Sequence, residues 1–81
     1  KPQWILNGTG WWYRHEDGSY TTNDFEVING QTYYFNTSGY MVTGWQLING
    51  NWYYFTSSGS MIRNQWIDGY YIDHNGIWIN T

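Results

Sequence analysis

Thr32-Tyr33-Tyr34-Phe35 is followed twenty residues later by Trp52-Tyr53-Tyr54-Phe55, and both aromatic runs are trailed by Ser-Gly-x-Met. Each run is also preceded by Ile-Asn-Gly, at positions 28–30 and 48–50. A fixed period of this length is typical of repeat proteins, in which one unit buries its apolar face only against stacked neighbours. The aromatic residues must therefore be interpreted by their place within the repeat.

Overlaying the copies gives four repeats, at approximately 4–24, 25–44, 45–65 and 66–81. The first carries Trp11-Trp12-Tyr13-Arg14, and the shortened fourth carries Gly69-Tyr70-Tyr71-Ile72. Stability of such an array needs about three stacked units. We therefore expect residues 1–81 to form a single module, and the abrupt start at Lys1-Pro2 suggests a fragment of a larger modular protein.

The composition limits how the core can be built. A chain of 81 residues makes one small domain, and it has no cysteine to cross-link it. Aromatic residues make up 23% of the chain and charged residues 11%, so the core must consist largely of rings. No apolar run is long enough to span a membrane, and a net charge of −3 disfavours nucleic acid, which needs a basic surface. We expect neither membrane insertion nor a nucleic-acid partner.

Alternation and turn signals predict a β-hairpin in each repeat. In the third repeat we expect a strand at 52–55, a turn at 56–59 with Gly59 at positive φ, and a returning strand at 60–62. We expect most of the Asn-Gly pairs, at 7–8, 29–30, 49–50 and 75–76, to lie in the links between hairpins. No window has helical apolar spacing. The predicted fold is all-β, a β-solenoid of about four tandem β-hairpins.

The titratable residues do not assemble into a catalytic site. Glu16-Asp17 and Asp73-His74 match turn positions of the other repeats, and neither histidine has a metal-ligand partner at usable spacing. No phosphate-binding loop or nucleophile elbow occurs. We therefore expect this segment to be no enzyme, with no catalytic residue, metal or cofactor.

The aromatic residues fall into two groups. Rings at repeating positions of a solenoid mostly form core, and we interpret four in this way: Tyr33, Phe35, Tyr53 and Phe55. The tryptophans instead occur as pairs with similar separations, Trp4 with Trp11 and Trp45 with Trp52. In the second repeat both equivalents change together, to Phe25 and Thr32. Because a binding cavity can be dispensed with in one unit more easily than a core ring, the paired change favours a ligand cage.

Several rings around one point, with few hydrogen-bonding side chains, suit a quaternary ammonium ion. Such a cation donates no strong hydrogen bond, but each ring face attracts it by about 0.5 to 2 kcal/mol. The negative net charge agrees with a cationic ligand.

The third repeat, with Trp45 and then Gly50-Asn51-Trp52-Tyr53-Tyr54-Phe55-Thr56-Ser57-Ser58-Gly59-Ser60-Met61, resembles the choline-binding, or cell-wall-binding, repeat. The first repeat, from Gly10-Trp11-Trp12-Tyr13 to Ile28-Asn29-Gly30, is similar to the opening of this module in autolytic amidases. In that family, tandem hairpins attach murein hydrolases, phage endolysins and surface proteins to choline-bearing teichoic acids. The resemblance implies a non-catalytic module of a secreted or phage-encoded protein, outside the cell at the bacterial wall, which anchors a lytic or surface domain.

The resemblance also implies a cavity between successive hairpins, walled by two tryptophans of one repeat and a tyrosine of the next, with a methionine or other apolar side chain as its floor. Carried over, one site comprises Trp4, Trp11, Tyr34 and Met41, and another comprises Trp45, Trp52 and Tyr71. Further candidates are Tyr54, Met61 and Trp66. This sequence departs from the family pattern at Phe25, Thr32, Arg14 and Gly69, and the pattern assigns no place to Trp78. Because family members often dimerise through terminal hairpins, a homodimer is expected.

Two alternatives stay open. A glucan-binding or other carbohydrate-binding repeat also carries Tyr-Tyr-Phe and stacks sugars on its rings, but it should add side chains that bond to hydroxyls. A purely structural oligomerisation segment would use its rings only for core and protomer contacts, and it would not respond to a ligand. The paired tryptophans favour choline over both.

Overall fold

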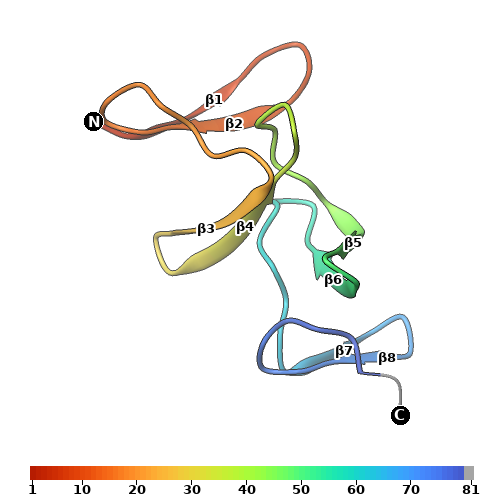
Figure 1. Cartoon of the computed structure of the whole chain (residues 1–81). Coiled ribbons are helices and arrows are strands. Elements are labelled where there is room, and N and C mark those ends of the chain that lie inside the picture. The colour runs from red at the N-terminus through yellow and green to blue at the C-terminus, as the bar shows by residue number, and fades with distance from the viewer. Residues whose placement is uncertain (80–81) are drawn as a thin grey trace. The chain divides into compact units, whose positions relative to one another are not determined.

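Residues 1–79, which the computed structural model describes, form eight short strands paired as four consecutive antiparallel hairpins (Figure 1). The strands are β1 (Gln3–Leu6), β2 (Trp11–Arg14), β3 (Asp24–Ile28), β4 (Gln31–Phe35), β5 (Gly44–Ile48), β6 (Asn51–Phe55), β7 (Gln65–Ile67) and β8 (Tyr70–Ile72). Each odd-numbered strand pairs with the strand that follows it, and this part of the chain contains no helix. The predicted all-β arrangement of tandem hairpins is confirmed.

The pairing of strands within each repeat differs from our prediction. Strand β6 does not return through residues 60–62. It pairs along its whole length with the preceding strand β5, from Gly44↔Phe55 to Ile48↔Asn51. Across the later turn there is an isolated bridge between Phe55 and Met61. The hairpin therefore precedes the turn at 56–59.

The Asn-Gly pairs explain this pairing. Asn49 and Gly50 have φ values of 51° and 84°, and Asn29 and Gly30 have 51° and 81°. Two successive positive φ values characterise the type I′ turn, whose twist matches that of the flanking strands. Each of these two Asn-Gly pairs therefore joins the two strands of a single hairpin, and Asn7-Gly8 likewise lies between the paired strands β1 and β2. Our expectation that most of the Asn-Gly pairs link separate hairpins was wrong.

A second turn follows the second strand of each repeat, and its glycine packs against the preceding repeat. The predicted positive φ of Gly59 is confirmed at 91°. The equivalent Gly39 also has positive φ, 89°, and a Cβ placed there would lie 2.7 Å from the ring of Tyr20. A Cβ at Gly76 would likewise collide with the side chain of Met61. Positive φ and a close contact between repeats therefore favour glycine at both positions.

The buried core lies at the ends of the strands. The almost fully buried side chains are Phe35, Phe55 and Ile72, with 1%, 0% and 0% exposure, and Ile28 and Ile48 are also buried. The core positions predicted for Phe35 and Phe55 are confirmed. Tyr33 and Tyr53, which we also interpreted as core, are only half-buried.

The chain divides into two compact units, Lys1–Val42 and a second unit that begins at Thr43. The first contains the hairpins β1–β2 and β3–β4, and the second contains β5–β6 and β7–β8. The first unit contains the pair Trp4 and Trp11, the second contains the pair Trp45 and Trp52, and each unit can be described by itself.

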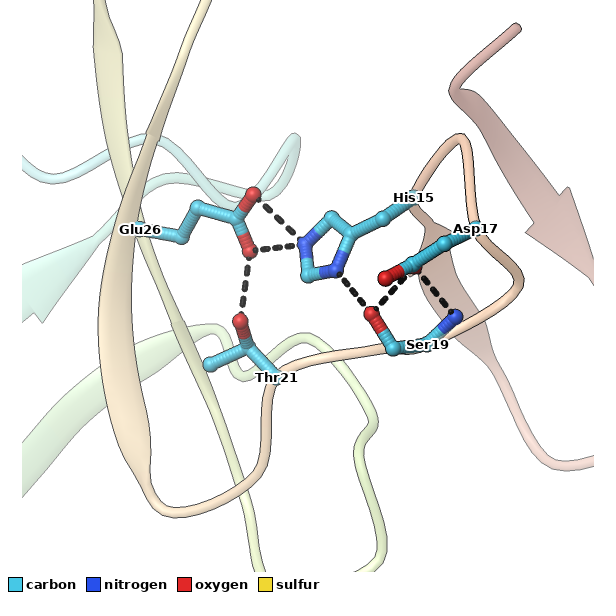
Figure 2. A network of polar contacts seen from close by, with 5 residues as sticks. All are labelled: His15, Asp17, Ser19, Thr21 and Glu26. Atoms are coloured by element: carbon cyan, nitrogen blue, oxygen red, sulfur yellow. Dashed lines mark hydrogen bonds and ion pairs between the residues drawn. The ribbon is translucent and has the colours of Figure 1, made fainter.

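A polar cluster connects the second turn of the first repeat, after β2, to β3 (Figure 2). His15 Nε2 lies 2.8 Å from Glu26 Oε2, and His15 Nδ1 lies 3.0 Å from Ser19 Oγ. The hydroxyl of Ser19 donates to Asp17 Oδ1 at 2.6 Å, and the hydroxyl of Thr21 donates to Glu26 Oε1 at 2.7 Å. The hydrogen bonds from Ser19 lower the pKa of Asp17 below its ordinary value.

This cluster occurs in the repeat that lacks a buried apolar residue at the end of its second strand. Arg14 holds the position that Phe35 and Phe55 occupy in the next two repeats, and it is only half-buried. The contact between His15 and Glu26 therefore supplies a polar connection between successive repeats where the apolar one is weakened.

Candidate ligand-binding site

The second unit contains a pocket of about 380 Å³ whose walls are aromatic. It is lined by Trp45, Trp52, Tyr70 and Trp78. This volume lies within the range of about 300 to 1,000 Å³ that is usual for small-molecule sites. None of the four side chains carries a charge, so the pocket offers ring faces and two kinds of polar edge, the indole N–H and the phenol hydroxyl.

The two hairpins of the unit position these rings. Trp45 lies on β5, and Trp52 faces Leu47 across the β5–β6 ladder, so both tryptophans project from the same face of the hairpin. Tyr70 begins β8, and Trp78 follows the second turn, where its N–H donates to the carbonyl of Trp52 at 2.9 Å. The pocket is therefore closed by residues of successive repeats.

The rings stand perpendicular to one another. The centroid of Tyr70 is 5.6 Å from that of Trp45 and 5.6 Å from that of Trp78, with interplanar angles of 85° and 88°. Trp52 is 39% exposed and Tyr70 is 48% exposed, although both are large apolar side chains. Rings that are ordered by edge contacts yet open to solvent form a cage that can receive a ligand.

The first unit brings together an equivalent set of residues. The centroid of Trp4 lies 6.4 Å from that of Trp11 and 4.9 Å from that of Tyr33. The N–H of Met41 donates to the carbonyl of Trp11 at 2.8 Å, as that of Trp78 does to Trp52. We call Trp4, Trp11, Tyr33 and Met41 the first-unit cluster. Of the residues predicted for this site, Trp4 and Trp11 contribute their rings to the cluster, and Met41 joins it through its backbone bond to Trp11.

The predicted closing tyrosines lie elsewhere. The second tyrosine of each run faces the first aromatic residue of its own hairpin, at centroid distances of 4.9 to 5.3 Å: Tyr34 faces Phe25, Tyr54 faces Trp45 and Tyr71 faces Trp66. The ring that reaches the tryptophan of the preceding repeat is the first of the run, Tyr33 or Tyr70. The geometry therefore favours Tyr33 and Tyr70 over Tyr34 and Tyr71 as closing walls.

The predicted residues Met61 and Trp66 also lie away from the lining of the pocket. Met61 packs against the turn glycine of the fourth repeat, Gly76. Trp66 is 65% exposed, and its ring contacts Tyr71.

Trp78 lines the pocket but was not among the predicted site residues, although the sequence contains a signal for it. Trp78 bridges Ile72 as Met41 bridges Phe35 and Met61 bridges Phe55. Each of these three residues stands two positions after the turn glycine of its repeat. Trp78 is therefore the fourth repeat's version of the methionine position, and aligning the turn glycines would have identified it.

Residues 22–66 match the family model of the choline-binding repeat. The chain belongs to this family. It is 37% identical to the structure of choline binding protein F from Streptococcus pneumoniae, with a TM-score of 0.92, over 99% of this chain and 27% of that chain. It is 34% identical to the multimodular pneumococcal cell wall endolysin from phage Cp-1 complexed with choline, with a TM-score of 0.84, over 95% of this chain and 24% of that chain.

A stretch of 26 residues, 32% of this chain, is 62% identical to the lytic amidase of Streptococcus pneumoniae phage HB-3 and covers 8% of it. The chain thus spans about a quarter or less of these relatives. These matches confirm the predicted family and the predicted class of tandem-hairpin β-solenoid. As a choline-binding repeat module, the chain is a non-catalytic binding segment.

Residues 1–79 contain neither a membrane-spanning helix nor a cluster of metal-binding side chains. No helix in this part of the chain is long and apolar enough to cross a membrane. No group of three or more His, Cys, Asp or Glu side chains in it is placed to hold a metal ion.

Proposed function

We propose that this module recognises the choline of bacterial teichoic acids through aromatic cages and thereby anchors an attached lytic or surface domain at the cell wall. The observation that carries the proposal is the pocket lined by Trp45, Trp52, Tyr70 and Trp78. Its four walls are rings supplied by successive repeats, and three of them are indoles, the best ring for attracting a cation.

The chemistry of the lining selects a quaternary ammonium ion over a sugar. Recognition of a sugar requires polar side chains that pair with its hydroxyls, because an unpaired polar group is costly to bury. No amide, carboxylate or ammonium side chain lines this pocket. A trimethylammonium group, in contrast, needs no hydrogen-bond partner and gains from each ring face.

The relatives support the remainder of the proposal. The phage Cp-1 endolysin was solved in complex with choline, and the phage HB-3 relative is a lytic amidase. Because this chain spans only a fraction of both, the attached domain and its location outside the cell are proposed by analogy with them.

Calorimetric titration with choline tests the function. The matched control ligand is 3,3-dimethylbutan-1-ol, the neutral isostere in which carbon replaces nitrogen. If two or three of the four ring walls contact the cation, at about 0.5 to 1 kcal/mol each, the isostere should bind about fivefold or more weakly than choline. Dextran should not bind. An isostere that matches choline would refute a cage that selects the cation. An α-glucan that binds where choline does not would replace this proposal with the carbohydrate-binding alternative.

The predicted homodimer through the terminal hairpin stays a prediction. Trp66 and Ile79 of the fourth repeat are 65% and 37% exposed, and they provide apolar surface for such a contact. Sedimentation equilibrium of the wild type and of Trp66→Lys tests it, since a dimer through this surface should dissociate in the variant. A wild-type chain that sediments as a monomer would refute it.

A further inference from the structure

We propose that Trp78 determines the relative strength of the two ring clusters and makes the pocket of the second unit the tighter quaternary-ammonium site. This inference rests on the proposed recognition of choline. It concerns the one position at which the two sets differ in residue type, with Met41 in the first-unit cluster and Trp78 in the pocket.

The backbone is equivalent at the two positions. Met41 and Trp78 each form a bridge to the end of the preceding strand, and each donates its N–H to the carbonyl of a cage tryptophan, at 2.8 and 2.9 Å. The following residues also correspond, because Val42 donates to the carbonyl of Tyr34 at 3.0 Å and Ile79 donates to that of Tyr71 at 3.2 Å. Met41 and Trp78 therefore have equivalent backbone hydrogen bonds and differ only in their side chains.

The two side chains offer a cation different surfaces. A thioether is flexible and polarisable, but it lacks the ring quadrupole that attracts a cation. The indole of Trp78 is also held in place, because it stands at 88° to the ring of Tyr70 with a centroid distance of 5.6 Å. The other members of the two sets match, with Trp4, Trp11 and Tyr33 corresponding to Trp45, Trp52 and Tyr70.

One additional indole face sets the size of the effect. The usual range for one cation–π contact corresponds to a change in dissociation constant of roughly two- to thirtyfold. We therefore expect the second-unit pocket to bind choline more tightly than the first-unit cluster by a factor in this range.

Calorimetry on paired variants separates the two sites. Trp11→Ala removes a wall of the first-unit cluster, so it reports the pocket of the second unit. Trp52→Ala removes a wall of that pocket, so it reports the first-unit cluster. In the Trp11→Ala background, Trp78→Met should weaken choline binding roughly two- to thirtyfold. In the Trp52→Ala background, Met41→Trp should strengthen it by a similar factor.

Trp12→Tyr is the matched control for loss of an indole. The equivalent residues Tyr33, Tyr53 and Tyr70 show that tyrosine fits this position, and Trp12 does not line the pocket. This control should leave choline affinity in the Trp11→Ala background unchanged.

The possible outcomes distinguish this inference from the proposed function. Unchanged or tighter choline binding by Trp78→Met overturns the role of Trp78 and leaves choline recognition intact. Absence of choline binding by the wild-type chain overturns both. If circular dichroism shows that Trp78→Met does not fold, Met41→Trp decides, since a gain in affinity supports the inference and no gain overturns it.

Discussion

Choline should stabilise the folded chain by binding in the aromatic cages. Trp52→Ala should abolish the stabilisation that comes from choline bound in the pocket of the second unit. A ligand at a hundred times its dissociation constant adds about 2.7 kcal/mol per site to the free energy of unfolding. For a small domain this corresponds to a rise in Tm of roughly 10 to 20 °C for the unit that binds. Trp52→Ala removes one wall of the pocket and should lose this rise.

The intrinsic cost of Trp52→Ala is set by its burial. With 39% of the side chain exposed, about 120 Å² of a tryptophan is buried, which corresponds to at most about 3 kcal/mol at 25 cal/mol per Å². The control is Phe55→Ala in the same strand. Phe55 is fully buried, so its truncation should cost about 3 to 5 kcal/mol. Because the two costs nearly overlap, stability without ligand does not distinguish the site from the core.

The response to choline does distinguish them. Thermal unfolding followed by circular dichroism, with and without choline, should show a full ligand-induced rise for Phe55→Ala, measured from its lower starting Tm. In Trp52→Ala, the same experiment should show no choline-induced rise in the Tm of the second unit. If Trp52→Ala kept the whole rise, or if folded Phe55→Ala lost it, we would have mistaken core for site.

Three further predictions follow from other contacts. Glu26→Gln should lower the free energy of unfolding, measured by urea titration, by about 1 kcal/mol, because it weakens the contact with half-buried His15. The control Glu16→Gln, at an exposed site, should change the free energy of unfolding by less than about 0.5 kcal/mol. Gly39→Ala should lower the free energy of unfolding by about 2 kcal/mol or more, because the positive φ and the ring of Tyr20 both oppose a Cβ. A variant with wild-type Tm would contradict this packing. Raising NaCl from 0.05 to 0.5 M should change choline affinity by less than about twofold, because rings and not surface charges attract the cation. A steep salt dependence of the affinity in calorimetry would contradict the cage.

The repeat pattern was sufficient to predict the all-β class and part of the core, and the resemblance of the third repeat to the choline-binding repeat indicated the family. Aromatic residues that recur every twenty positions have the same neighbours in each repeat, so Phe35 and Phe55 are identifiable as equivalent buried positions. The paired tryptophans and Gly59 were recognised for the same reason. The polar contact between His15 and Glu26 was not predicted, because these residues do not recur in the other repeats and so leave no periodic signal.

The pairing of strands needed the tertiary structure. Each repeat contains two turn signals, Asn-Gly and Ser-Gly, and the sequence does not state which of them joins the longer ladder. In the third repeat, two residues in the left-handed region at Asn49-Gly50 allow five paired residues in each strand, whereas the turn at Gly59 is followed by a single bridge.

The composition of the cage was also decided by the tertiary structure. Alternation along β8 shows that Tyr70 and Tyr71 point to opposite faces, but it does not show which face meets the preceding repeat. Stacking of the hairpins turns Tyr70 toward Trp45 and leaves Tyr71 opposite Trp66 within its own hairpin. Trp78 reaches the pocket because its backbone bonds to Trp52 of the preceding repeat. Contacts between repeats depend on how one hairpin rotates against the next, and that rotation follows from packing across the interface, which no single repeat contains.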